Sequence, residues 1–340
     1  MRIAEIAPPW FAVPPTGYGG IEWVVSLLAD GLANNGHDVT LYAPGGSTTT
    51  AKLVSPFAKP TGGEHIGETY FDVVHAAAAY LDANEFDVVH DHSGMIGPAI
   101  GSQCGTPVVH TLHGPFTDRA KHFYRMLSGR LHYVAISEAQ RAFCPELSYL
   151  ATIHNGIDMS KAPYREKKKD YVLFLGRINK EKGPELAVDA AKRAGRRLVM
   201  AVKMSEEFEK EYWRDIIEPR LTGDEEIIGE ISVEEKGELL ANAAGVLFPI
   251  QWPEPFGLVM AEAMACGTPV ISFENGAAPE VIADGRTGFL VKTFDEFCDR
   301  IGRLEEIDPR TCRDHVQKKF SAEVMVNGYE RAFEELLSST

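Results

Sequence analysis

Two glutamates in the segment QWPEPFGLVMAEAMACGTP, Glu254 and Glu262, stand eight positions apart across a predicted junction between a loop and a helix. In a helix, eight residues turn the second side chain roughly 80° from the first and carry it about 12 Å along the axis. The two carboxylates therefore cannot act as a pair on one helical face. Their spacing predicts that they contact different parts of one elongated ligand.

The helix that follows Glu254 is predicted to begin near Pro255 and to run to Cys266, with Gly267 as its end signal. Glu254 is then a loop residue at the mouth of a site. At the positive end of the helix dipole, four backbone amides lack helical partners and would bind an anion, those of Phe256, Gly257, Leu258 and Val259. The simpler interpretation of Glu254 alone is a helix cap.

Glu262 stands within an apolar run of alanines and methionines, Met260, Ala261, Ala263, Met264 and Ala265. The run predicts a buried helix, and a buried carboxylate needs partners. The simpler alternative for a single glutamate is a solvated helix residue.

Apolar runs alternate with helical periodicity along the chain, and the alternation occurs twice. The first series contains RIAEIA, DVTLYA, EFDVVH, TPVVHTL and LHYVAI, and the second contains DYVLFLG, RRLVMAV, EEIIGE, AGVLFP, TPVISF and TGFLV. This pattern is typical of parallel sheets covered by helices on both faces. It predicts two Rossmann-like α/β domains.

The stretch MSKAPYREKKKD, with its proline and charges, predicts a domain boundary within residues 159–170. We expect an N-terminal domain at 1–162, a C-terminal domain at 163–320, and a last segment at 321–340. In that segment, SAEVMVNGYERAFEELL predicts a helix after an N-cap at Ser321.

Polar motifs follow the predicted strands at their carboxyl ends, where open parallel sheets bind ligands. After the first strand comes a glycine-rich loop, Gly17-Tyr18-Gly19-Gly20, which opens a helix and could place its amides against a phosphate. A dinucleotide-binding fingerprint is excluded because it would need a glycine at Glu22. The loop could equally be a plain turn.

Arg177 and Lys182, in GRINKEKG, put two cations on a loop between a strand and a helix. Such cations are usually solvated, but a diphosphate is bound well by a planar bidentate arginine together with a mobile lysine. The chain shows neither a Walker A motif nor an acidic pair spaced as in metal-dependent sugar transferases. We therefore expect no catalytic metal.

Four histidines lie at neighbouring strand ends, His90, His92, His110 and His113. His90 and His92 would face the same way on an extended segment, so a zinc site is geometrically conceivable. Hydrogen-bonded histidines of a core or cleft are commoner than metal ligands, and that is the interpretation we prefer.

These motifs together resemble the retaining glycosyltransferases of the glycogen synthase-like and mannosyltransferase-like group, family 4. The resemblance covers nearly the whole chain and rests on the order and spacing of its segments, which include PPTGYGGIEWVV, VVHDHSG, VVHTLHG, VAISEAQR, IHNGID, VLFLGRINKEKG and PIQWPEPFGLVMAEAMACGTPV. It implies a GT-B fold, in which two Rossmann-like domains face a central cleft and the C-terminal helix crosses back to the N-terminal domain.

The resemblance also implies roles for residues on the donor side. Arg177 and Lys182 would bind the donor diphosphate, with the amides of Gly19, Gly20, Gly257, Leu258 and Val259. Glu262 would bind the ribose hydroxyls. The transferred sugar would contact Glu254, Phe256 and Gly257.

The resemblance implies that Glu254 and His113 are catalytic residues. His113 would hydrogen-bond the transferred sugar near its O6 or the reacting carbon. His92 would shape the acceptor side. The expected reaction is metal-independent, retaining transfer from a UDP- or GDP-sugar to an acceptor hydroxyl, without a cofactor. One departure from relatives, Val202-Lys203 where glycine is frequent, leaves the identity of the base open.

Composition limits the partners and the location. The net charge of −15 opposes binding to nucleic acid or anionic lipid, and the only compact basic run, REKKK, is typical of a solvated linker. The five cysteines are scattered and contain no C-x-x-C pair, which fits a reducing compartment. No signal peptide or membrane helix is predicted, so we expect a cytoplasmic protein with a nucleotide-sugar donor and an unidentified acceptor.

Three other functions fit part of these features: a nucleotide-sugar epimerase, a phosphorylase-like enzyme on the same architecture, and a non-catalytic nucleotide-sugar-binding protein. Epimerases lack the combination of GRxxxxKG with two glutamates eight apart, and phosphorylases are far longer and carry a pyridoxal lysine site. The presence of Glu254, Arg177, Lys182 and His113 favours a transferase over a binding protein.

Overall fold

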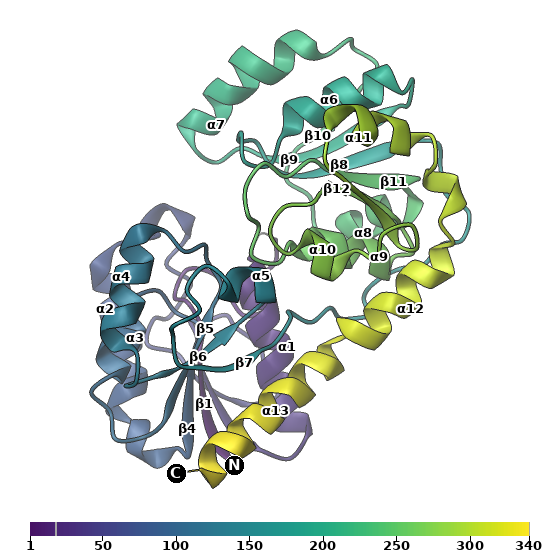
Figure 1. The fold of residues 1–340 in the computed structure, drawn as a ribbon. Helices are drawn as coiled ribbons and strands as arrows, with labels where there is room; N and C mark the ends of the chain where they lie inside the picture. The colour runs from purple at the N-terminus through teal and green to yellow at the C-terminus, as the bar shows by residue number, and fades with distance from the viewer. Residues whose placement is uncertain (18, 340) are drawn as a thin grey trace. The chain divides into compact units, whose positions relative to one another are not determined.

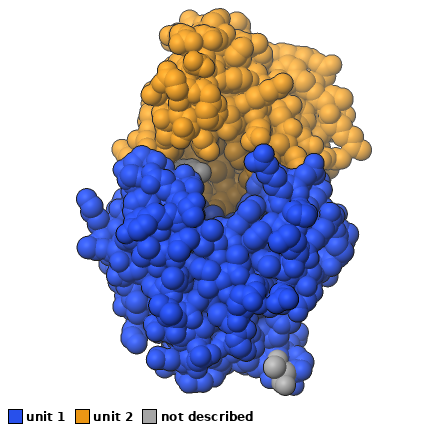
Figure 2. All heavy atoms as spheres, turned by 90° about the vertical axis from the view of Figure 1, so that its left-hand side faces the viewer, with its two compact units in different colours: residues 1–156, 322–340 blue, residues 157–321 orange. Residues whose placement is uncertain are grey.

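The computed structural model of the protein describes residues 1–17 and 19–339 (Figure 1). The chain divides into two compact units, which Figure 2 shows in different colours. Unit 1 consists of residues 1–156 and 322–340, and unit 2 of residues 157–321. None of the helices in the described part of the chain is long and apolar enough to cross a membrane.

Unit 1 is built on a seven-stranded parallel sheet with the strand order β3-β2-β1-β4-β5-β6-β7. Its strands are β1 (Arg2–Ile6), β2 (Asp38–Tyr42), β3 (Lys52–Val54), β4 (Val88–Asp91), β5 (Val108–Leu112), β6 (His132–Ala135) and β7 (Tyr149–Thr152). The order reverses between β1 and β4, which are adjacent in the sheet but not in sequence. This topological switch point is where such sheets bind ligands.

The helices of unit 1 cover this sheet, and its central strands are buried on both faces. They are α1 (Gly20–Asn34), α2 (Thr69–Leu81), α3 (Ile96–Gly101), α4 (Asp118–Leu127), α5 (Glu138–Arg141) and α13 (Ala322–Ser338), with short 3-10 turns η1 (Gly63–His65) and η2 (Ala83–Glu85). The C-terminal helix α13 lies against α1 (Figure 1). Gly31 permits this approach, since a Cβ there would lie 2.4 Å from Val326.

Unit 2 repeats the plan with a six-stranded parallel sheet in the order β10-β9-β8-β11-β12-β13, so its switch point lies between β8 and β11. The strands are β8 (Val172–Arg177), β9 (Leu198–Lys203), β10 (Glu226–Ile228), β11 (Gly245–Phe248), β12 (Val270–Phe273) and β13 (Gly288–Val291).

The helices of unit 2 are α6 (Pro184–Arg193), α7 (Glu207–Tyr212), α8 (Val233–Asn242), α9 (Leu258–Ala265), α10 (Ala278–Val281), α11 (Phe294–Ile301) and α12 (Pro309–Lys319). A π-helical turn, η3 (Trp213–Ile217), and two 3-10 turns, η4 (Glu218–Arg220) and η5 (Leu304–Glu306), complete it. Several of these helices begin with a capping box, as at Ser232 and Thr293.

Two parallel-sheet α/β units confirm the predicted fold class. The last helix also packs on the N-terminal unit, as the resemblance implied. One boundary was wrong, because α9 begins at Leu258, after an N-cap at Gly257, and not near Pro255. Gly257 has φ 79° and ψ 66°, a left-handed conformation that cannot continue a right-handed helix.

Candidate active site

The candidate residues of unit 2 follow the two strands that flank its switch point. Arg177 is the last residue of β8, Lys182 lies in the loop from β8 to α6, and Glu254 lies in the loop from β11 to α9. Because β8 and β11 are parallel neighbours, their carboxyl ends meet at one edge of the sheet. The topology therefore brings the predicted donor residues to the same edge.

The Arg177 guanidinium forms an ion pair with a carboxylate on α7. Arg177 Nε donates to Glu209 Oε1 at 2.6 Å, and the Glu209 side chain has no solvent exposure. The other Glu209 oxygen accepts from the backbone amides of Ser205 and Glu206 at 2.8 and 3.0 Å. Burial alone would raise the pKa of Glu209, but these amides and Arg177 outweigh it and hold the pKa below its usual value. Glu209 thus fixes Nε and leaves the two terminal guanidinium nitrogens for another ligand.

Lys182 and Glu254 form an ion pair in which Nζ lies 2.5 Å from Oε2. The same oxygen accepts a hydrogen bond from Trp252 Nε1 at 2.9 Å, and the ammonium lies 5.4 Å from the centre of the Trp252 ring. Gly183 allows this arrangement, because its φ is 65° and a Cβ there would lie 2.3 Å from the carbonyl oxygen of Pro249. The close approach brings the lysine loop onto the end of β11.

The Glu254 backbone is also fixed. Its carbonyl accepts from Ala277 N at 2.9 Å, and its amide donates to the carbonyl of Trp252 at 2.8 Å. Gly276, with φ 54°, is needed there because a Cβ would lie 2.3 Å from the Glu254 carbonyl oxygen. The carboxylate therefore stands on a rigid loop.

The N-terminus of α9 lies directly after this loop. Since the helix starts at Leu258, the amides of Leu258 and Val259 are in its first turn, and Phe256 precedes the helix. The Phe256 side chain is 2% exposed and packs on Phe320, with ring centres 5.8 Å apart. A sugar could therefore meet Phe256 only through its backbone.

Glu262 lies on α9 and pairs with Lys236 of α8, whose Nζ is 2.6 Å from Oε1. Its side chain is 22% exposed and so only partly buried, while the surrounding helix is buried as predicted, at Met260, Ala261 and Ala263 among others. Glu254 and Glu262 thus have different basic partners. This agrees with the inference that the two carboxylates do not act as a pair.

In unit 1, the glycine-rich loop ends in Gly19, the N-cap of α1, and Gly20 is the first helical residue. Tyr18 of this loop lies outside the described residues. Gly19 has φ 149°, and a Cβ there would lie 2.8 Å from Pro15 and 2.9 Å from a Glu22 carboxylate oxygen. A glycine is required because of both the backbone conformation and this close approach.

Glu22, in the first turn of α1, is 3% exposed, and burial raises its pKa to about 7. A carboxyl whose pKa is raised on folding contributes stability that is fully present below its unfolded pKa, 4.5, and lost as the pH rises through the folded value. Glu22→Gln should therefore stabilise the protein relative to wild type at pH 8, by up to about 3 kcal/mol, and much less at pH 4.5.

Thermal unfolding of both proteins between pH 4.5 and 8 tests this prediction. The difference in melting temperature should grow through that interval and then level off. A difference that is independent of pH would show that Glu22 is charged in the folded protein throughout, or is not buried.

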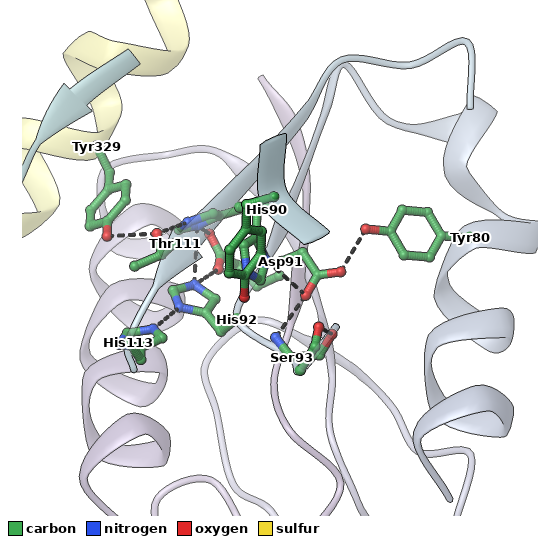
Figure 3. Close-up of polar contacts among 12 residues, drawn as sticks. Tyr80, His90, Asp91, His92, Ser93, Thr111, His113 and Tyr329 are labelled. Atoms are coloured by element: carbon green, nitrogen blue, oxygen red, sulfur yellow. Dashed lines mark hydrogen bonds and ion pairs between the residues drawn. The ribbon is translucent and has the colours of Figure 1, made fainter. Parts of the chain in front are cut away.

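His92 follows β4, which flanks the switch point of unit 1, and His113 follows β5, the next strand of the sheet. His113 Nε2 lies 2.8 Å from His92 Nδ1 (Figure 3). His113 is half-buried, whereas His92 is only 2% exposed. His92 therefore has almost no exposed surface with which to contact an acceptor directly. Burial lowers the pKa of each of these imidazoles to about 3, so both rings are neutral at neutral pH.

His90 and His92 lie together with Glu5 of β1, and one ligand atom from each lies within 4.8 Å of the others. His110, the fourth histidine considered, lies elsewhere: its Nε2 is 3.4 Å from Tyr124 OH and its Nδ1 is 3.7 Å from Asp91. The histidines thus divide into two groups. The sequence prediction did not include Glu5.

Chemically, unit 2 presents two cations and the N-terminus of a helix beside a fixed carboxylate. The cations and the amides suit a diphosphate, and Glu254 suits sugar hydroxyls or a developing positive charge. Glu262 and Lys236 offer an acceptor and a donor for hydroxyl groups further along α9. This set of groups could bind a ligand that carries both negatively charged phosphates and hydroxyl groups.

Two family models match the chain. The model of glycosyl transferases group 1 matches residues 157–319, and the model of glycosyltransferase family 4 matches residues 18–161. The two matched segments lie almost entirely in unit 2 and unit 1, respectively.

Named relatives extend over most of the chain. It is 28% identical to a D-inositol 3-phosphate glycosyltransferase of Mycobacteroides abscessus, with 86% of this chain and 79% of the relative covered. It is 27% identical to a phosphatidyl-myo-inositol mannosyltransferase of Mycolicibacterium smegmatis, with 87% and 82% covered. Among solved structures, AviGT4, a glycosyltransferase involved in avilamycin A biosynthesis, aligns with a TM-score of 0.74 and 26% identity over 100% of this chain and 99% of that one.

Proposed function

Since this chain belongs to the glycosyltransferases of group 1 and family 4 and is a glycosyltransferase, we propose that it transfers a sugar from a UDP- or GDP-sugar to an acceptor hydroxyl, with retention and without a divalent metal. The observation that carries the proposal is the group at the switch point of unit 2. There Lys182 pairs with the Glu254 carboxylate, and Arg177 ends the neighbouring strand at the same edge of the sheet, where the loop to the N-terminus of α9 also lies.

In this proposal the donor diphosphate binds the terminal nitrogens of Arg177, Lys182 and the amides of Gly257, Leu258 and Val259. Lys182 would exchange its contact with Glu254 for the phosphate oxygens. Glu262 binds the ribose hydroxyls. The released Glu254 carboxylate then faces the sugar.

The bond between the anomeric carbon and the diphosphate oxygen breaks while the acceptor oxygen bonds to the same face of that carbon. The hydroxyl proton leaves with the departing diphosphate. The transition state resembles an oxocarbenium ion, so the stabilisation of charge at both ends supports most of the catalysis. His113 would contact the transferred sugar, and the Gly19 and Gly20 amides would contact the diphosphate or the acceptor.

A panel of UDP, GDP, ADP and TDP in thermal-shift assays tests the donor class, because a ligand at 100 times its dissociation constant adds about 2.7 kcal/mol of stability. We expect UDP or GDP to raise the melting temperature most. Slow hydrolysis of the matching nucleotide sugar without acceptor would then show catalysis. If no nucleoside diphosphate stabilises the protein, the proposed donor site is wrong.

Activity should survive an excess of EDTA. The positive charge that Mg²⁺ or Mn²⁺ supplies in metal-dependent transferases would come here from Arg177, Lys182 and the α9 amides. Donor hydrolysis and UDP binding should be equal with EDTA and with added Mn²⁺. Loss of turnover in EDTA with recovery in Mn²⁺ would contradict this account of the site.

A further inference from the structure

A buried carboxylate lies on β1, an inner strand of the unit 1 sheet, and contacts His92, the hydrogen-bond partner of His113. Glu5 is the fourth residue of β1, where it lies among the buried apolar residues Ile3, Ala4 and Ile6, and its side chain has no solvent exposure. In the parallel register of β1 and β4, Glu5 pairs with His90. A buried carboxylate is costly unless it is hydrogen-bonded, so its bonds explain why it is tolerated there.

Each Glu5 oxygen contacts one histidine, one of them on β4 and the other in the loop after β4. Oε1 lies 3.0 Å from His90 Nδ1, and Oε2 lies 3.1 Å from His92 Nε2. The chain of bonds continues in both directions (Figure 3). On one side His92 Nδ1 lies 2.8 Å from His113 Nε2.

On the other side, His90 Nε2 lies 2.8 Å from the Thr111 hydroxyl, which lies 2.9 Å from the hydroxyl of Tyr329 on α13. The two ends of this network differ in whether their groups can reverse the direction of their hydrogen bonds. The hydroxyls of Thr111 and Tyr329 can rotate and either donate or accept, so His90 Nε2 keeps its bond to Thr111 in either neutral tautomer, while Nδ1 must donate when it faces an ionised Glu5.

His92 has no such rotating hydroxyl partner, since its Nε2 faces Glu5 Oε2 and, at 3.2 Å, His90 Nδ1, and its Nδ1 faces His113. With Glu5 accepting, Nε2 of His92 carries the proton and Nδ1 accepts. Nε2 of His113 must then donate to His92, and Nδ1 of His113 is left as an acceptor. Among the described residues, His113 Nδ1 has no hydrogen-bond partner.

We propose that Glu5 is a positioning residue, which fixes the ring orientation and proton position of His92 and, through it, presents His113 with Nδ1 as a hydrogen-bond acceptor. The chemical class recognised by that nitrogen is a hydroxyl group, such as a sugar hydroxyl. This inference rests on the proposed function for the identity of that hydroxyl. The tautomer itself does not depend on it.

The role needs an acceptor atom facing His92 and not a negative charge. If Glu5 is protonated, or replaced by glutamine, its hydrogen donor can face His90, because that histidine and the two hydroxyls can reverse their bonds. The side facing His92 then stays an acceptor. Glu5→Gln should preserve the arrangement, whereas Glu5→Leu should remove it.

The matched control is Tyr329→Phe, which removes one buried hydrogen bond from the His90 end of the same network. Glu5→Gln, Glu5→Leu and Tyr329→Phe would be compared with wild type in thermal unfolding, UDP affinity and donor turnover. Proton–nitrogen correlation spectra of protein labelled at the histidine ring nitrogens report the tautomers directly, and His113→Gln identifies the His113 signals.

We expect wild type, Glu5→Gln and Tyr329→Phe to show His113 protonated on Nε2 and to keep turnover. Glu5→Leu should lose this signature and lower kcat by about tenfold or more, the usual loss when the partner that orients a functional histidine is removed. Its UDP affinity should stay unchanged. The Tyr329→Phe control separates this loss from a general loss of stability.

Several results would overturn the inference. These are an Nδ1-protonated His113 in wild type, full turnover in Glu5→Leu, or an equal loss in Glu5→Gln, which would show that a negative charge is needed. One equivalent of zinc in the purified protein would also overturn it, since Glu5, His90 and His92 would then be metal ligands. If His113→Gln keeps full turnover while the other results are as expected, the proposed contact between His113 and the sugar is wrong. The spectra then still decide whether Glu5 fixes the tautomer of His113.

Discussion

Glu254→Gln is expected to lower turnover by about 10²- to 10³-fold without weakening the binding of a sugar-free nucleoside diphosphate. The substitution keeps the shape of the side chain and removes the charge that would oppose the positive anomeric carbon. The sugar-free diphosphate has no group for Glu254 to contact. It should bind no less tightly, because Lys182 loses the carboxylate that holds it at 2.5 Å.

Glu262→Gln is the matched comparison, since it makes the same chemical change eight residues further on. It should weaken both the donor and the free diphosphate by about 1.5–3 kcal/mol, the usual value of a hydrogen bond to a charged group. Calorimetry with the diphosphate and initial rates with the full donor separate the two variants. Equal losses of diphosphate affinity, or full turnover in Glu254→Gln, would refute the assignment of these residues to sugar and ribose.

The architecture could be predicted from the sequence because it depends on patterns that are local and repeated. Apolar strands alternate with amphipathic helices, and the motifs sit at strand ends, so the sheet edge that carries Arg177 and Glu254 follows from topology alone. The error at the start of α9 has a local cause. Pro255 is a good first helical residue, but the left-handed Gly257 interrupts the chain two positions later.

The partners of the candidate residues could not be predicted, because they are distant in sequence. Glu209 lies 32 positions from Arg177, and Lys236 lies 26 positions from Glu262. A signal for Glu5 did exist, since it is the one acidic residue within the apolar run RIAEIA. A charge in a central strand predicts buried partners, and the histidines that follow the EFDVV strand could have been considered for that role.

Trp252 illustrates a different limit. It belongs to the same sequence segment as Glu254. Sequence spacing nevertheless does not show that its ring nitrogen donates to Glu254 at 2.9 Å. The two residues are only two positions apart in a loop, where side-chain directions depend on the turn. The backbone of that turn also packs against Gly276, where a Cβ would lie 2.3 Å from the Glu254 carbonyl oxygen. Local motifs thus predicted which residues gather, and the fold determined how they are held.

Arg177→Ala is expected to weaken nucleoside-diphosphate binding by about 1.5–3 kcal/mol, or roughly tenfold to 150-fold. Glu209 holds Nε at 2.6 Å, and the Arg177 side chain is 36% exposed, so its terminal guanidinium nitrogens could bind a phosphate. Arg177→Lys should lose nearly as much, since an ammonium cannot bond Glu209 and a phosphate in the same planar, bidentate manner. Calorimetry with UDP or GDP measures both.

The structure adds a complication, because Arg177→Ala leaves the unexposed Glu209 without its cationic partner. The variant should therefore also melt at a lower temperature, as buried charges that lose a partner destabilise a fold. The double variant Arg177→Ala with Glu209→Gln should recover much of that stability, since it removes the unpaired charge, but none of the diphosphate affinity. Recovery of both would show that Arg177 acts only by holding α7 in place. Recovery of stability alone would assign the guanidinium to the diphosphate and Glu209 to its orientation.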